Sequence, residues 1–347
     1  MAFQNIVGKL LAPVIIGLAL SSGGAHANID LVGLNIAGAE FTPDKLPGKL
    51  DTHYFFPKNA HLQSWAEKGI RNIRFPIKWE RLQPKLNGPL DPFYATQIDR
   101  LLANAARNDM DVILDVHNYG RYRGKVVGTK DVPLSAYQNL LERMAQRWGK
   151  HPALYGYDIM NEPYGLADQY WPKAAQAGIN GVRKFDRDNI IFVEGASYSS
   201  AERWAWYADK LLDLQDPSDN LVFSAHLYLD RDASGRYVEK TDQSFDPNIG
   251  IKRATPFINW LQKNGKRGHI GEIGVPPHDK RWLNAMDRTL AHLQKHCIPV
   301  TYFAAGPAWG NHFLSVEPKD GKNKPQWGVL KKYVGQGDCS DFGPAAR

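Results

Sequence analysis

Two glutamates in this sequence have the residue type and the setting needed for acid–base chemistry on one substrate. Glu162 stands between Asn161 and a proline, Glu272 follows a glycine, and both come directly behind apolar runs. A carboxyl group in such a position is costly unless it is paired or used. If the two face one pocket, one can deliver a proton while the other, ionised, attacks or activates water, which is what cleavage of a glycosidic bond requires.

The neighbours of the two glutamates predict different roles for them. Arg74, together with a hydrogen bond from Tyr228, would hold Glu272 ionised, so we expect Glu272 to be the nucleophile. Glu162, on a less cationic side, would keep its proton and serve as acid/base. The amide of Asn161 can bind a sugar 2-hydroxyl, although a turn residue before a proline would also explain it.

Two histidines stand near the same strand ends. We expect His117 and His226 to hydrogen-bond the sugar or the catalytic carboxylates, and Asn118, beside His117, to bind substrate or support the site. A metal site with Asp115 or a glutamate as third ligand is the alternative. The sequence has no His-x-His on a strand, no His-Glu-x-x-His helix and no Cys/His cluster, so we expect neither a metal nor another cofactor.

Three of the ten tryptophans lie behind predicted strands and could stack on pyranose rings. We expect this of Trp309, which follows the last strand. Trp204 and Trp206 follow the fifth strand, and for them packing of a helix explains the residue type equally well.

The elements that must position these residues alternate along the chain. Eight apolar, β-branched runs recur every 30 to 47 residues: Leu31 to Ile36, Asn72 to Ile77, Asp111 to Val116, Leu154 to Met160, Ile190 to Val193, Leu221 to Ala225, Arg267 to Ile270 and Pro299 to Phe303. Between them lie segments with apolar residues at helical spacing, among them Tyr94 to Ala105, Tyr137 to Trp148 and Trp282 to Leu293. Strands that alternate with helices predict a parallel sheet, and eight such units predict a single-domain α/β protein, a (β/α)8 TIM barrel. Such a barrel carries its chemistry at the carboxyl ends of the strands, where the polar residues above stand.

The first 27 residues have the pattern of a secretory signal peptide. Lys9 precedes an apolar stretch from Leu10 to Leu20, which is too short for a bilayer span, and the small residues around Ala27 fit a cleavage site. We therefore expect residues 1–27 to be removed, residues 28–347 to form the catalytic domain, and the protein to be secreted without a membrane anchor.

The formal charge of +7 raises the question of a nucleic-acid partner. Lys and Arg are spread along the chain with one modest cluster from Lys322 to Lys332, so a solvated basic surface is the better interpretation. Cys297 and Cys339 would meet an oxidising compartment, which favours a disulfide over two free thiols. A monomer is the default expectation.

Taken together, the sequence resembles glycoside hydrolase family 5, a large group of retaining (β/α)8 enzymes that includes many cellulases. Asn161 and Glu162 with the following proline match the motif that carries the family's acid/base, and Glu272 matches its nucleophile. By the same resemblance, the positions around the glutamates are filled by Arg74, His117, Asn161, His226, Tyr228 and Trp309.

Within that family, the segment from His117 to Tyr122 and the Ala-Gly-Ala-Glu-Phe stretch that ends at Phe41 are similar to endo-β-1,4-glucanases. The resemblance implies a β-linked glucan as substrate and no cofactor. Another β-linked polymer, such as mannan, xylan or mixed-linkage glucan, is the alternative substrate. A non-catalytic carbohydrate-binding barrel is a remote alternative, because it would not need two opposed glutamates.

Overall fold

The computed structural model describes residue 1 and residues 29–238, 244–335 and 338–344, so the predicted signal peptide lies outside the described residues apart from Met1. Eight parallel strands close into a barrel: β1 (Val32–Ile36), β2 (Asn72–Ile77), β3 (Asp111–Val116), β6 (Leu154–Asp158), β7 (Ile190–Glu194), β8 (Leu221–His226), β9 (Gly268–Ile273) and β10 (Val300–Ala305). β1 closes the ring, since Leu34 pairs with Ile73 of β2 and Val32 pairs with Val300 of β10. The predicted barrel and its eight strands are confirmed.

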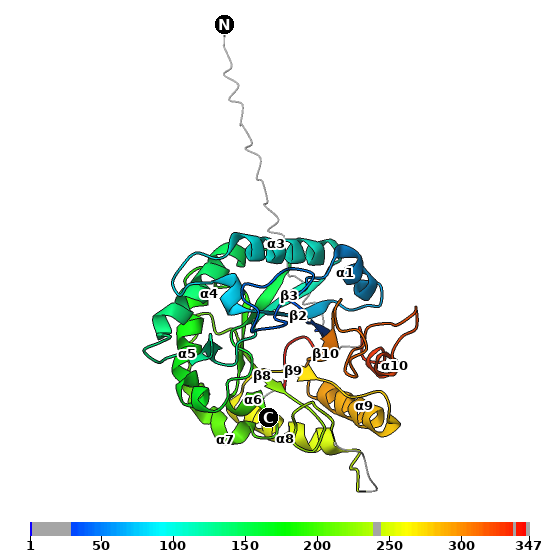
Figure 1. The fold of residues 1–347 in the computed structure, drawn as a ribbon. Helices are drawn as coiled ribbons and strands as arrows, with labels where there is room; N and C mark the ends of the chain where they lie inside the picture. The colour runs from blue at the N-terminus through cyan, green and yellow to red at the C-terminus, as the bar shows by residue number, and fades with distance from the viewer. Residues whose placement is uncertain (2–28, 239–243, 336–337, 345–347) are drawn as a thin grey trace.

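Helices cover the outside of the barrel and form a ring around the strands (Figure 1). They are α1 (Asn59–Ala66), α2 (Trp79–Leu82), α3 (Pro92–Arg107), α4 (Leu134–Trp148), α5 (Leu166–Arg183), α6 (Ala196–Ser199), α7 (Trp204–Tyr207), α8 (Ile249–Asn264), α9 (Lys280–Lys295) and α10 (Pro325–Leu330), with a 3₁₀ helix η1 (Ala208–Asp213) after α7. In α3 the side chain of Asp91 accepts a hydrogen bond from Tyr94 N at 2.7 Å and caps the helix, while Pro92 occupies its first turn. The buried stripe of α3, which includes Ile98 and Leu101, is the one that the helical spacing predicts.

Two segments depart from the simple alternation of strands and helices. After β3 a small hairpin forms from β4 (Arg121–Tyr122) and β5 (Lys125–Val126). After β7 the single outer helix is replaced by α6, α7 and η1. Trp204 of α7 is buried against Phe257 and Trp260, so packing explains this residue, whereas Trp206 is exposed.

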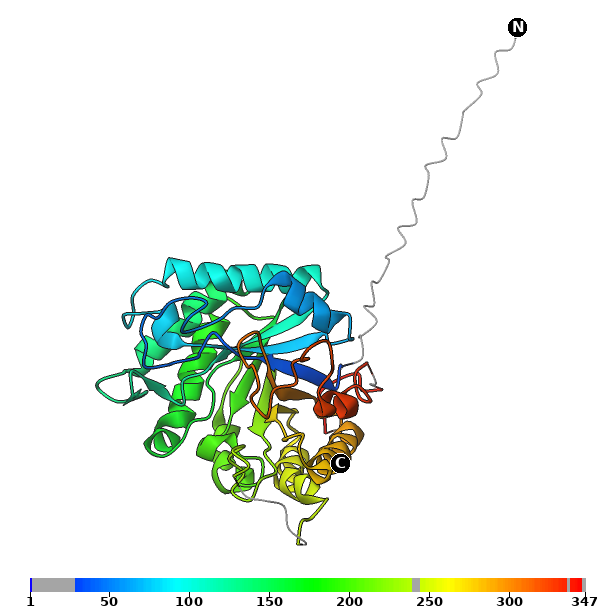
Figure 2. The same ribbon diagram turned by 45° about the vertical axis from the view of Figure 1, so that its right-hand side comes forward.

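The amino-terminal ends of the strands are closed by the end of the chain. Cys297 and Cys339 form the predicted disulfide, Ile29 N donates to Cys339 O at 2.8 Å, and Phe342 joins a buried cluster with Phe192 of β7. Figure 2 shows the red carboxyl-terminal segment beside the blue start of the chain. The opposite end of the barrel, where the strands finish, is therefore the end available for a substrate.

No helix among the described residues is long and apolar enough to cross a membrane.

Candidate active site

The centre of the barrel's carboxyl end is organised by one buried arginine. Arg74 of β2 has no exposed side-chain surface, and its guanidinium reaches four carboxylates: Nε lies 2.8 Å from Asp158, Nη1 lies 3.1 Å from Glu272, and Nη2 lies 2.8 Å from Glu194 and 3.1 Å from Asp115. The planar fork of donors in arginine suits such a set of acceptors, which a lysine could not serve. The carboxyl ends of five strands are thereby tied to one cation.

Burial and charge set the protonation of this cluster. Burial opposes the charge of Arg74, but the four carboxylates outweigh it and raise its pKa well above the ordinary value. Burial and the nearby Glu194 raise the pKa of Asp158 well above its usual range. Burial also opposes ionisation of Glu194, yet His226 and Arg74 lower its pKa to about 2. Of these two carboxyl groups, Glu194 is therefore the fixed anion and Asp158 the one that takes up a proton more readily.

Glu272 is held by two donors at the end of β9. Its Oε1 accepts from Arg74 Nη1 at 3.1 Å, and its Oε2 accepts from the Tyr228 hydroxyl at 2.7 Å. The glycine before it is required by space, because a Cβ on Gly271 would lie 2.7 Å from Ser224 Oγ and 3.0 Å from His226 Nε2. Both contacts of Glu272 that the sequence analysis predicts, with Arg74 and with Tyr228, are present.

Glu162 stands on a strained backbone behind β6. Its φ of 45° lies in the left-handed region, and its N–H donates to Glu194 Oε2 at 2.6 Å, which fixes this conformation. Its Oε1 lies 2.7 Å from His226 Nδ1. Burial raises the pKa of Glu162 above its ordinary value, and the side chain stays 17% exposed toward the pocket. Such a carboxyl group can carry a proton to a ligand.

The two glutamates lie close together. One oxygen of Glu162, one of Glu272 and a ring nitrogen of His226 all lie within 4.8 Å of one another. This spacing would also suit metal ligands. Burial opposes the charge of His226, but Glu194 and Glu272 raise its pKa well above the ordinary value, and a protonated imidazole has no lone pair for a metal. The donor set therefore fits a proton donor paired with an anion better than it fits a metal.

Asn161 has one amide atom fixed and one free. Its Oδ1 accepts from Arg74 Nη2 at 2.8 Å, while its buried Nδ2 has no hydrogen-bond partner among the described residues. A buried donor without a partner is rare, and a ligand hydroxyl would satisfy it. His117 reaches the same cluster through Asp115, whose Oδ2 lies 2.7 Å from His117 Nδ1.

Two of the predicted site residues lie apart from these contacts. Asn118 turns away: its Oδ1 accepts from Trp79 N at 2.9 Å and its Nδ2 donates to Glu80 Oε2 at 2.8 Å, so it supports the loop rather than facing the glutamates. Trp309 follows β10 as predicted and is half-buried in edge-on contact with Phe41 and Phe303. Its stacking on a sugar stays a prediction.

Sequence reasoning missed Glu194. It closes β7 and contacts Arg74, the backbone of Glu162 and His226, the last with 3.0 Å between Oε1 and Nε2. The signal was present, because Glu194 follows the apolar run that ends at Val193 in the same way that Glu272 follows its own run. Asn35 of β1 was missed as well; its Oδ1 accepts from Arg74 Nη1 at 3.0 Å.

A pocket of about 450 Å³ opens over Glu162, between the loops that follow β7 and β8. Its lining comes from Glu162, Tyr198, Ser200, Arg203, His226, Tyr228, Asp232, Ala233, Ser234 and Arg236. The loop after β8 therefore contributes to this face through residues 232–234 and 236, while residues 239–243 lie outside the described part. We call this the catalytic-face pocket.

Known proteins resemble this chain in sequence and in fold. Residues 34–308 match the family described as cellulase (glycosyl hydrolase family 5). Endo-β-1,4-glucanase B of Aspergillus niger is 31% identical over 92% of this chain and 96% of its own length. The crystal structure of endoglucanase Cel5A of Pseudomonas stutzeri in complex with cellobiose is 43% identical, covers 93% of this chain and 97% of its own, and superposes with a TM-score of 0.89.

An endo-β-1,4-glucanase of Xanthomonas axonopodis pv. citri is 33% identical, with coverage of 88% and 98% and a TM-score of 0.83. The family match spans the strands from β1 to β10, and it contains the buried arginine and both glutamates that the barrel brings together. On this evidence the chain belongs to glycosyl hydrolase family 5.

Proposed function

We propose that the protein is an endo-β-1,4-glucanase that hydrolyses internal bonds of a β-linked glucan with retention of configuration. The observation that carries the proposal is the separation of less than 4.8 Å between oxygens of Glu162 and Glu272. Retaining enzymes place their carboxyl groups about 5 to 5.5 Å apart, whereas inverting enzymes need about 6.5 to 9.5 Å to admit a water. The names of the relatives support the choice of glucan.

In the proposed mechanism the two glutamates act in two steps. Glu272 attacks the anomeric carbon while Glu162 gives its proton to the departing oxygen, so that the glycosidic bond breaks and a glycosyl–enzyme ester forms. Glu162, now ionised, takes a proton from water, whose oxygen attacks the anomeric carbon and releases Glu272. The first step needs a protonated Glu162, and its raised pKa supports this assignment.

The surrounding residues have supporting roles in this proposal. Arg74 and Tyr228 donate to Glu272 and orient it for attack. The unpartnered Nδ2 of Asn161 would donate to the sugar 2-hydroxyl, an interaction that strengthens in the transition state. Trp309, on the loop after β10, would stack on a pyranose ring.

The decisive experiment is an NMR assay of cellotetraose hydrolysis, in which retention predicts that the β-anomer of the product appears first. Glu272→Gln should remove nearly all hydrolysis of carboxymethyl-cellulose while the circular dichroism spectrum stays unchanged. An α-anomer as first product, or substantial activity in Glu272→Gln, would contradict the mechanism. Hydrolysis rates on mannan, xylan and mixed-linkage glucan test the choice of substrate. A faster rate on one of these polymers than on cellulose would make that polymer the substrate in place of cellulose.

We also propose that residues 1–27 direct export and are removed, which leaves residues 28–347 as the catalytic domain outside the cell. The disulfide between Cys297 and Cys339 supports this, because such bonds persist in oxidising compartments. Amino-terminal sequencing of the exported protein tests the cleavage site, and an intact leader on that protein would refute it.

A further inference from the structure

The loop that carries Trp309 is tied down by one carboxylate that the proposed mechanism does not use. This loop, residues 306–317, begins directly after β10, and β10 is the neighbour of the strand β9 that carries Glu272. Glu317 stands at the far end of the loop. Its Oε1 accepts a hydrogen bond from the backbone N–H of Gly306, the first residue of the loop, with 2.7 Å between the two atoms. One side chain therefore joins both ends of the loop.

Helix α1 holds the same oxygen from the other side. Oε1 of Glu317 lies 2.9 Å from His61 Nε2 and accepts from Trp65 Nε1 at 3.2 Å. Trp65 is fully buried and packs edge-on against Trp327 of α10, with 5.3 Å between the ring centroids, so it offers Glu317 a fixed donor. Hydrogen bonds to an ionised acceptor are among the stronger ones in proteins. Glu317 thereby fastens the loop to the outer ring of helices.

Trp309 depends on this loop for its own position. Its indole Nε1 is buried and makes no hydrogen bond with any residue that the structure describes, so packing and the backbone orient the ring. Gly306 approaches Trp309 at two places. Trp309 N donates to Gly306 O at 3.3 Å, and a Cβ on Gly306 would lie 3.0 Å from Trp309 Cδ1. A shift of the Gly306 peptide would therefore move the ring.

We propose that Glu317 is a positioning residue, which holds the loop of residues 306–317 so that Trp309 is already in place when a pyranose ring arrives. The inference rests on the proposed function, in which Trp309 stacks on the sugar. A group that is fixed before binding loses little conformational freedom on binding, so its placement favours affinity. A contact made equally with the bound substrate and with the transition state lowers KM and leaves kcat unchanged. Glu317 should therefore act on KM.

The kinetic test is a double-mutant cycle on cellotetraose with Glu317→Ala and Trp309→Ala. Each single substitution should raise KM roughly three- to tenfold at nearly constant kcat, the factor that one aromatic contact supplies. If Glu317 acts through Trp309, the double variant has the KM of Trp309→Ala alone, whereas independent contributions multiply. The milder Glu317→Gln keeps an acceptor oxygen and should raise KM by a smaller factor. It takes the place of Glu317→Ala in the cycle if that variant does not fold.

Asp99→Ala is the matched control for a loss of stability. Asp99 also accepts an indole N–H, from Trp148 at 2.7 Å, and it binds Arg147, but it joins α3 to α4 on the outside of the barrel. Both alanine variants should lower the midpoint of urea unfolding, and only Glu317→Ala should raise KM. An equal rise in KM in Asp99→Ala would assign the effect to stability and overturn the inference.

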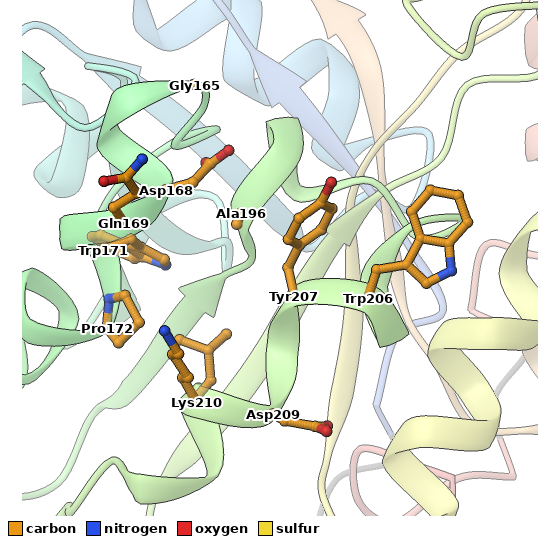
Figure 3. Close-up of a pocket in the computed structure, with 11 residues that line it drawn as sticks. Gly165, Asp168, Gln169, Trp171, Pro172, Ala196, Trp206, Tyr207, Asp209 and Lys210 are labelled. Atoms are coloured by element: carbon orange, nitrogen blue, oxygen red, sulfur yellow. The ribbon is translucent and has the colours of Figure 1, made fainter.

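A readout without substrate comes from fluorine NMR of protein labelled with fluorotryptophan. In Glu317→Ala the Trp309 signal, assigned by its absence in Trp309→Phe, should shift or broaden while the Trp148 signal stays. Asp99→Ala should have the reverse effect. Trp206 of α7 (Figure 3) is 70% exposed and serves as the internal reference, because α7 follows β7, whereas Glu317 follows β10 and Asp99 lies in α3.

The outcomes separate this inference from the proposed function. If Trp309→Ala raises KM but the substitution of Glu317 changes neither KM nor the Trp309 signal, only the inference fails. A double variant whose KM is the product of the two single effects overturns it as well, since Glu317 would then act without Trp309. If Trp309→Ala itself leaves KM unchanged, the stacking assigned in the proposed function fails, and the role of Glu317 fails with it. If the unaltered protein cleaves no β-glucan, the proposed function fails first.

Discussion

At the scale of single residues, the cluster around Arg74 depends on Glu194 as much as on Glu162 and Glu272. One of its oxygens binds Arg74 and lies against His226, and the other accepts the backbone N–H of the strained Glu162. In the proposed mechanism, a residue that touches Glu162 and Glu272 only through these groups acts by positioning. Its contribution should therefore appear in turnover rather than in substrate affinity.

Glu194→Gln should lower kcat about 100-fold with little change in KM, because the backbone of Glu162 and the ring of His226 lose the charge that holds them. Glu194 is also the strongest of the charges that raise the pKa of His226, so its removal lowers that pKa. A group with a raised pKa keeps its proton up to a higher pH, so the titration of His226 in the variant moves to lower pH. Steady-state kinetics on cellotetraose and an NMR titration of the ring measure both effects.

The surface variant Glu142→Gln is the control, because Glu142 pairs with Lys184 away from the site and should change neither quantity. A fall in kcat with an unchanged His226 titration would show that Glu194 has only a general structural role.

At the scale of elements, β9 approaches β8 closely at Gly271, the residue before Glu272. A Cβ on Gly271 would meet Ser224 Oγ and His226 Nε2, so Gly271→Ala pushes the imidazole from its place between the carboxylates. We expect kcat to fall at least tenfold, with a loss of stability of about 1–3 kcal/mol from overpacking. Activity assays and urea denaturation measure the two effects.

Gly328→Ala in α10 is the matched control for this substitution. A Cβ at this helical position has no neighbour within 4 Å, so we expect unchanged activity and a slight gain in stability. Full activity in Gly271→Ala would contradict the close approach of β8 and β9.

The elements also show what the sequence can predict and why. Apolar runs and apolar residues at helical spacing indicate which residues are buried. All eight strands and the helices α3, α4 and α9 were therefore predicted within a few residues. The segment after β7 escaped prediction because its short helices and left-handed turn are fixed by contacts such as Asp168 to Ser197, which sequence spacing does not show. The predicted strand ends were enough to single out Glu162 and Glu272 as candidates. That Glu194 points toward Arg74 and Asn118 points away from the glutamates is set by tertiary contacts, which the sequence does not show.

At the scale of the whole molecule, one end of the barrel is open for chemistry and the other is closed by the chain's own end. Ile29 N binds Cys339 O, Gly343 N binds Cys297 O at 2.7 Å, and Phe342 packs among buried residues of the strands. The disulfide joins the segment after α9 to this closing segment, at the end of the barrel opposite the one that carries both glutamates. The disulfide should therefore contribute to the stability of the fold and have no effect on the catalytic rate.

Removing the bond by Cys297→Ser with Cys339→Ser tests this division. The bond closes a loop of 42 residues, and the chain-entropy relation gives a loss of about 4 kcal/mol when it is removed. For a chain of this size that corresponds to a fall in Tm of roughly 6 °C, measured by calorimetry. At 25 °C the kcat on cellotetraose should equal that of the unaltered protein, because among the described residues no site residue makes a hydrogen bond or ion pair with the closing segment. A large loss of kcat in the folded variant would mean that the closed end of the barrel is coupled to the open one. An unchanged Tm would mean that the hydrogen bonds of Ile29 and Gly343 hold the segment without the disulfide.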